Sequence, residues 1–166
     1  NELSIYYYAY ISYLQKDYKT ALTEFERLKG SKPYESSYPY YISAMYFLDQ
    51  RYDDVINYAI PILKSTKQLY ETEMFRIVGA SFFAKSDYTN AGAYYRSFQK
   101  NDQGKTQNNQ DNYQIGYTWY KLKDYKNAII ELEKLETTDQ YFQSGMIALG
   151  ESFLKTGNKQ GARSAF

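Results

Sequence analysis

The chain has 166 residues with 20 basic and 19 acidic side chains, and it contains neither cysteine nor histidine. A formal charge of +1 provides no strong field for nucleic acid or an anionic membrane, so no nucleic-acid partner is expected. The missing histidines and cysteines exclude Ser-His-Asp and Cys-His catalysis, disulfides, and zinc sites built on these ligands. No apolar run approaches the roughly 18 residues of a membrane-spanning helix, so we expect no membrane insertion within this segment.

The first predicted unit, residues 2–35, contains a stretch that returns later in the chain. KDYKTALTEFERL begins at Lys16, and the similar KDYKNAIIELEKL begins at Lys123. Counted from the Tyr, apolar residues follow at offsets of 3, 7 and 10, which is the spacing of one face of an α-helix. The Asp before the Tyr is typical of a helix N-cap. The pattern therefore predicts helices that begin near Tyr18 and Tyr125.

The same pattern occurs five times, with reference positions 34, 36, 37 and 34 residues apart. In the second unit Arg51 replaces the capping residue, and we expect Asp53 and Asp54 to stabilise the positive end of the helix dipole instead. The reference positions are Tyr18, Tyr52, Tyr88, Tyr125 and Lys159. The repeats are approximately 2–35, 36–71, 72–108, 109–142 and 143–166.

A second helix is predicted ahead of each reference position, with a small residue nine positions upstream of it. A glycine inside a helix costs about 1 kcal/mol relative to alanine, so the three glycines at this place indicate close packing against a partner helix. The five small residues are Ala9, Ser43, Gly79, Gly116 and Gly150.

Three departures from the pattern carry structural expectations. Pro61 falls within the second helix of the second unit and should kink or shorten it. The polar stretch KNDQGKTQNNQDN, residues 100–112, should form a loop between the third and fourth units. The chain stops at Phe166, midway through a helix and without a polar capping helix, which predicts a fragment of a longer protein.

Two helices per unit at a period near 34 resemble the tetratricopeptide repeat. The chain keeps the family's small residue at repeat position 8 in all five units and its Tyr at position 17 in four, whereas the Pro at position 32 survives only as Pro33. The resemblance implies an all-α fold: a single right-handed superhelical array of about five antiparallel helix pairs, with the last repeat incomplete. The composition, rich in Lys, Asn and Tyr, also resembles envelope-associated repeat proteins of Bacteroidetes-type bacteria and implies a periplasmic or cell-envelope location.

The carboxylates offer no convincing catalytic arrangement. Asp53 and Asp54 are adjacent on a predicted helix, where neighbouring side chains diverge, and both lie where a helix N-terminus favours negative charge. No glycine-rich phosphate loop follows a strand. We therefore predict a non-catalytic protein with no cofactor and no metal site.

The 22 tyrosines point to binding instead. The family resemblance implies a concave groove lined by the first helix of each unit at repeat positions 2, 5, 9, 12 and 13, of which positions 5, 9 and 12 supply the candidates below. Tyrosine suits such a groove, because it combines a large apolar area and a hydroxyl with few rotatable bonds. The alternative is that these side chains only pack against neighbouring helices. The predicted groove residues are Tyr6, Tyr10, Tyr13, Tyr40, Phe47, Arg76, Phe83, Tyr113, Tyr117 and Tyr120.

Three functions remain open at this point. The first is a scaffold or adaptor that binds a peptide or protein partner in the aromatic groove. The second is a module for a glycan or small ligand, because aromatic faces also stack on sugar rings. The third is a structural spacer in a larger envelope protein. The family resemblance also implies that the reference tyrosines pack between units, so we expect Tyr125→Ala to cost about 3 kcal/mol or more.

Overall fold

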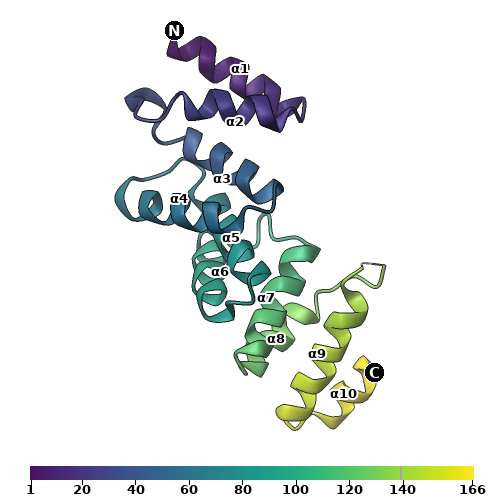
Figure 1. Cartoon of the computed structure of the whole chain (residues 1–166). Helices are drawn as coiled ribbons and strands as arrows, with labels where there is room; N and C mark the ends of the chain where they lie inside the picture. The colour runs from purple at the N-terminus through teal and green to yellow at the C-terminus, as the bar shows by residue number, and fades with distance from the viewer. Residues whose placement is uncertain (139) are drawn as a thin grey trace. The chain divides into compact units, whose positions relative to one another are not determined.

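The structure, a computed structural model, describes residues 1–138 and 140–166, which form α-helices joined by short connections (Figure 1). No strand occurs among these described residues. The chain divides into two compact units, Asn1–Ser81 and Phe82–Phe166, and each is described by itself.

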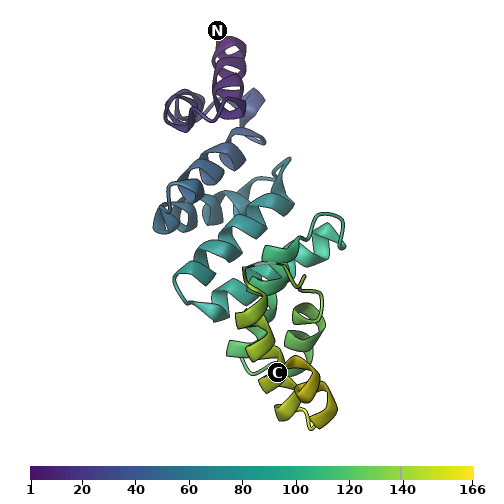
Figure 2. The same cartoon turned by 90° about the vertical axis from the view of Figure 1, so that its right-hand side faces the viewer.

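Unit 1 contains two antiparallel helix pairs and most of a fifth helix. Within it α1 packs on α2, α3 packs on α4, and α2 also contacts α3. The two purple helices, α1 and α2, remain adjacent in the perpendicular view (Figure 2). The elements are α1 (Glu2–Leu14), α2 (Tyr18–Glu26), the short 3-10 helix η1 (Lys32–Tyr34), α3 (Tyr38–Leu48), α4 (Tyr52–Ser65) and α5 (Glu71–Ala84), which ends in unit 2.

Unit 2 repeats this arrangement. Here α7 packs on α8 and α9 on α10, while α6 contacts α7, and α9 contacts both α7 and α8. The elements are α6 (Tyr88–Asp102), α7 (Asn109–Lys121), α8 (Tyr125–Leu132), α9 (Phe142–Lys155) and α10 (Lys159–Ala165).

The apolar stripe predicted for the second helix of each pair is buried in the first four units, except at Ile62, which is half-buried. At offset 7, Phe25, Tyr95 and Leu132 are all 0% exposed. Phe166 occupies that offset in the last unit and is 71% exposed, so the stripe is not fully covered there. The offset-3 residues, each no more than 3% exposed, are Ala21, Val55, Ala91, Ala128 and Ala162.

Glycine allows two helix contacts that a larger residue would prevent. A Cβ on Gly116 of α7 would lie 2.6 Å from Leu132 Cγ of α8, which confirms the predicted close approach of these helices. A Cβ on Gly92 of α6 would lie 2.9 Å from the ring of Trp119 of α7. That ring is 4% exposed, and the Arg96 guanidinium lies 4.7 Å from its centroid. The small residues therefore set the distance between neighbouring helices.

All five turns within the helix pairs share one backbone geometry. Two residues before each reference position the chain adopts a left-handed conformation, with φ between 56° and 82°. In the first pair, Asp17 N donates to Ser12 O of the preceding helix at 2.9 Å, and the Asp17 carboxylate accepts from Thr20 N of the next helix at 3.2 Å. One residue thus caps both helices. The left-handed residues are Lys16, Gln50, Ser86, Lys123 and Gly157.

The predicted N-caps are confirmed where the sequence places Asp or Asn. Asp17, Asp87, Asp124 and Asn158 each accept a hydrogen bond from the first turn of the following helix. Arg51 makes no such bond, and its helix has Asp53 and Asp54 in the first turn as expected.

Two boundary expectations need correction. Pro61 does not shorten its helix, because α4 continues to Ser65. The Asn57 carbonyl loses the helical hydrogen bond that Pro61 cannot donate, but both residues are exposed, where water can satisfy that carbonyl. The predicted loop at 100–112 is also too long, since α6 runs to Asp102 and α7 begins at Asn109.

Candidate functional site

In unit 1, three of the predicted groove tyrosines meet around Tyr41. The Tyr10, Tyr13 and Tyr40 rings contact Tyr41 edge to face, with centroids 5.8, 5.2 and 5.0 Å away. Tyr41 itself is 5% exposed and stacks on the buried Phe25 ring at 4.7 Å. Tyr41 is not among the residues predicted for the groove, although it directly follows Tyr40 and so begins the buried side of the same helix.

Three further tyrosines extend this cluster. Tyr6 stacks on Tyr34 at 4.8 Å, and Tyr70 lies 4.9 Å from the Tyr40 ring. Burial, followed by the hydrogen bond that its hydroxyl donates to Tyr70 at 3.4 Å, raises the pKa of Tyr41 far above the ordinary value. Burial likewise raises the pKa of Tyr40. These phenols remain neutral, so the cluster offers hydroxyls and ring edges and carries no charge.

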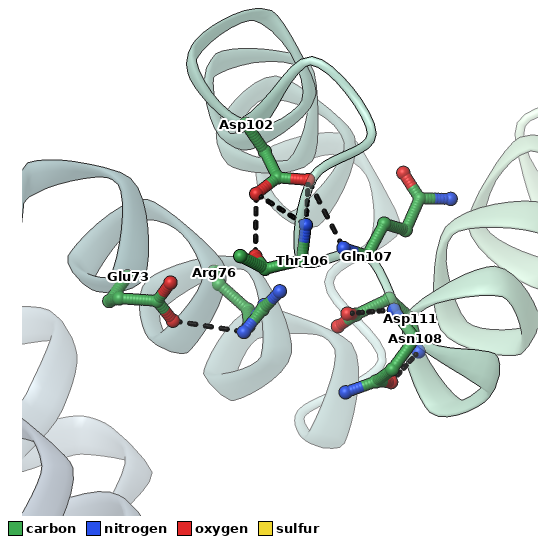
Figure 3. Close-up of polar contacts among 7 residues, drawn as sticks. All are labelled: Glu73, Arg76, Asp102, Thr106, Gln107, Asn108 and Asp111. Atoms are coloured by element: carbon green, nitrogen blue, oxygen red, sulfur yellow. Dashed lines mark hydrogen bonds and ion pairs between the residues drawn. The ribbon is translucent and has the colours of Figure 1, made fainter.

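Phe47 and Arg76 occupy different surroundings within unit 1. The Phe47 ring contacts Tyr52 edge to face at 5.7 Å, next to the turn between α3 and α4. An Arg76 guanidinium nitrogen donates to Glu73 Oε2 at 2.9 Å, one turn earlier on α5 (Figure 3). Because this carboxylate already binds Arg76, the contact to a ligand carboxylate that we expected of this side chain would have to compete with it.

In unit 2, the predicted tyrosines form a continuous row on α7. Tyr113 and Tyr117 have centroids 5.6 Å apart, and Tyr117 and Tyr120 have centroids 5.7 Å apart, as expected for residues one helical turn apart. Phe83 contacts the first two rings at 6.3 and 6.1 Å. Tyr141, which is not among the predicted groove residues, stacks on Tyr113 at 4.8 Å.

Two shallow depressions lie along this row and share Tyr120. The first, of about 240 Å³, is bounded by α7 and α9 and has no charged residue in its lining. The second, of about 210 Å³, extends to the α7–α8 turn and contains several lysines. The first is lined by Tyr113, Tyr117, Tyr120, Ser144, Ile147 and Ala148. The second is lined by Tyr120, Lys121, Lys123, Tyr125, Glu151 and Lys155.

Tyr120 occupies the junction of the two depressions. Its hydroxyl donates a hydrogen bond to Glu151 of α9. This bond, followed by burial, raises the pKa of Tyr120 to about 12. The phenol therefore stays neutral and the Glu151 carboxylate has a fixed partner, so that α7 and α9 are joined across the depressions.

A polar loop fixes the start of the helix that carries this row. The Asp102 carboxylate accepts hydrogen bonds from Thr106 N, Thr106 Oγ1 and Gln107 N at 2.5 to 3.1 Å (Figure 3). Asn108 and Asp111 then form a capping box, in which each side chain accepts from the backbone N–H of the other. These contacts order the backbone immediately before Tyr113.

The described residues contain no cluster of three or more Asp, Glu, His or Cys side chains that could hold a metal ion. Asp54 pairs with Arg51 at 2.7 Å and lies in the first turn of α4. This placement agrees with the structural interpretation of the Asp53–Asp54 pair. Among the helices that the structure describes, none combines the length and hydropathy needed to cross a membrane.

Comparison with solved structures supports the fold. Structures of MamA AMB-1 and MamA MSR-1 align with TM-scores of 0.77 and 0.73 at 12% and 11% identity, covering 99% of this chain and 87% and 92% of theirs. The apo form of RapI aligns with a TM-score of 0.67 at 16% identity, covering 99% of this chain and 67% of RapI. Neither a family model nor a curated protein matches the sequence.

These neighbours are helical repeat proteins of the tetratricopeptide type. The predicted fold class, an all-α array of helix pairs, is therefore confirmed. At 11 to 16% identity the likeness supports the fold alone, and the function has to be argued from the site.

Proposed function

We propose that the chain is a non-catalytic scaffold or adaptor that binds a peptide or protein partner on its tyrosine-lined first helices. The observation that carries this proposal is the α7 row, where half-buried tyrosines border two connected depressions. Ring–ring contacts hold each tyrosine in place before a partner arrives, so little side-chain entropy remains to be lost on binding.

A second argument comes from the size of the depressions. Each holds about 210 to 240 Å³, which is below the roughly 300 to 1,000 Å³ of ordinary small-molecule pockets. Neither depression would enclose a drug-sized ligand. Individual side chains of an extended peptide fit these dimensions better, and the groove would engage several of them in succession.

The test is peptide-library selection on the immobilised chain, followed by affinity measurement on variants. We expect Tyr117→Ala to weaken the selected peptides at least about tenfold, the range of a central aromatic contact. Tyr8→Ala is the matched control, because Tyr8 is 56% exposed on α1 and outside the groove residues. Peptides that bind both variants as well as the parent would contradict the proposal.

A parallel screen on a glycan array separates this proposal from the other two functions considered. A glycan array that yields ligands dependent on Tyr117, with no selected peptide, would favour a glycan-binding module. A chain that binds neither class would favour a structural spacer. The periplasmic or cell-envelope location stays a prediction, which fractionation of the source cells would check.

A further inference from the structure

The second depression of unit 2 has an excess of positive charge. Its lining includes the three basic residues Lys121, Lys123 and Lys155 against the single acidic residue Glu151. The Glu151 carboxylate accepts the hydrogen bond from the Tyr120 hydroxyl. The side of the groove near the α7–α8 turn is therefore basic, whereas the adjoining depression is uncharged.

None of these three lysines forms an ion pair with another residue in the part of the chain that the structure describes. Several cations elsewhere pair with a carboxylate three residues away in the sequence, as in Arg27–Glu24 at 2.6 Å and Lys134–Glu131 at 2.9 Å. The groove lysines thus keep their capacity to bind an external anion.

The aromatic row holds the ammonium group of Lys121 near the groove, and the backbone of Lys123 is ordered in the adjoining turn. Lys121 Nζ lies 5.7 Å from the Tyr88 centroid and 5.9 Å from the Tyr117 centroid, which is cation–π range. Lys123 is the left-handed residue of the α7–α8 turn, and its N–H donates to Tyr120 O at 3.0 Å. The positive charges are therefore attached to ordered elements.

We propose that the two depressions together select an acidic peptide segment. An aromatic or branched aliphatic side chain of the partner lies against Tyr113, Tyr117 and Ile147, and its neighbouring carboxylates lie beside the three lysines. This inference rests on the proposed function and specifies the chemistry of the partner. A peptide matches both halves, since Ile147 is 51% exposed in a depression whose lining is uncharged, which a sulfated glycan would leave unused.

The experiment uses fluorescence anisotropy with a labelled twelve-residue peptide that contains one Phe flanked by four Glu. A second peptide has Gln in place of each Glu, and a third has Ala in place of Phe. Because several exposed charge pairs each make a small contribution, we expect the Glu peptide to bind roughly five- to tenfold more tightly than the Gln peptide. Higher salt should reduce this difference.

Variants assign the preference to the groove lysines. Lys123→Gln combined with Lys155→Gln should remove the preference for Glu over Gln, whereas Lys100→Gln, an exposed change on α6, should retain it. Lys123→Glu combined with Lys155→Glu should instead favour a peptide with Lys in place of Glu. Circular dichroism melting curves that match the parent show that each variant is folded.

Two results would overturn the acidic selection while leaving the proposed function intact. One is equal affinity for the Glu and Gln peptides, with both weakened by Tyr117→Ala. The other is a preference for Glu that survives the double Gln variant. Heparin binding that depends on the same lysines, without peptide binding, would show that the lysine-lined depression binds a glycan and not an acidic peptide. Loss of peptide binding in every form, including the selected library, is failure of the proposed function itself.

Discussion

At the scale of single residues, hydroxyl groups buried beside carboxylates make the protein sensitive to alkaline pH. Tyr46 is 7% exposed, and its hydroxyl donates to Glu26 Oε1 at 3.0 Å. Burial first, and this hydrogen bond second, raise the pKa of Tyr46 to about 12. In the unfolded chain a tyrosine ionises near 10. The stability that the neutral Tyr46 hydroxyl contributes to the folded chain is therefore fully present below pH 10 and is lost as pH rises from 10 to 12.

We expect the urea midpoint to fall between about pH 9 and pH 11, and to fall less in Tyr46→Phe, because Phe cannot ionise in either state. Chemical denaturation followed by circular dichroism at both pH values measures the difference. Tyr8→Phe serves as control, since Tyr8 is 56% exposed. An equal fall in the parent and in Tyr46→Phe would show that Tyr46 ionises alike in the folded and unfolded chains.

Residue burial also revises the energetic role of the reference tyrosines. Tyr125 is only half-buried, and its ring meets Tyr120 at 6.4 Å, so the loss of about 3 kcal/mol expected from its repeat position is too large. Tyr95 is 0% exposed and donates to Gln114 Oε1 at 2.7 Å. We now expect Tyr95→Ala to cost about 3 kcal/mol or more and Tyr125→Ala about 1 to 2 kcal/mol. Denaturant titration of both variants checks the order, and a larger loss for Tyr125→Ala would reverse this assignment.

At the scale of elements, the shared left-handed turn predicts opposite effects for two substitutions. Ser86 has φ 59°, a conformation that costs a residue with a side chain about 1 kcal/mol, whereas Gly157 occupies the equivalent place without that cost. Ser86→Gly should relieve this cost, but glycine also increases the conformational entropy of the unfolded chain, so the net stabilisation should be about 0.5 kcal/mol. Gly157→Ala should destabilise the protein by about 1 kcal/mol. Thermal unfolding of the two variants tests both signs; a shift in the same direction would refute the common geometry.

The sequence predicted the helix pairs because two independent signals coincide in them. The Asp or Asn N-cap marks where each second helix begins, and the offsets of 3, 7 and 10 mark its buried face. The left-handed turn residues carried no such signal, since Lys, Gln and Ser have no particular preference for positive φ. Only Gly157 could have been recognised from its residue type.

The site was less predictable than the helices. The repeat positions selected the α7 tyrosines, but they also selected Phe47 and Arg76, whose partners Tyr52 and Glu73 come from local packing. The three positions carried over, 5, 9 and 12, do not include Lys123, which lies in a turn, or Lys155, which lies at repeat position 13 of a neighbouring helix and also lines the second depression. A repeat pattern specifies which face of a helix a residue occupies. Which long side chains reach a groove from a turn or a neighbouring helix depends on the spacing between the helices, which the pattern does not give.

At the scale of the whole molecule, the structure consists of elements that mostly contact their neighbours in sequence. Stability in such an array is close to a sum of local terms, so damage should remain local. Gly116→Ala would place a Cβ 2.6 Å from Leu132 Cγ, and overpacking of this kind costs about 1 to 3 kcal/mol. The cost should fall on the α7–α8 pair.

Hydrogen exchange followed by mass spectrometry tests this locality. In Gly116→Ala we expect faster exchange in α7 and α8 and unchanged exchange in α1 and α2. Thr89→Ala, an exposed change on α6, is the control and should alter neither region. Equal acceleration in all four helices would show that the chain unfolds as one cooperative body.

The buried Trp119, which packs against Gly92 and beneath Arg96, is the only tryptophan in the chain. It lies on α7, the helix that also carries the tyrosine row. Tyrosines transfer excitation energy to a nearby indole, and burial shifts indole emission to shorter wavelengths. The protein therefore contains its own optical probe on the helix proposed to bind the partner. Its emission would report the unfolding of unit 2 and the arrival of a ligand at the neighbouring tyrosines, without any attached dye.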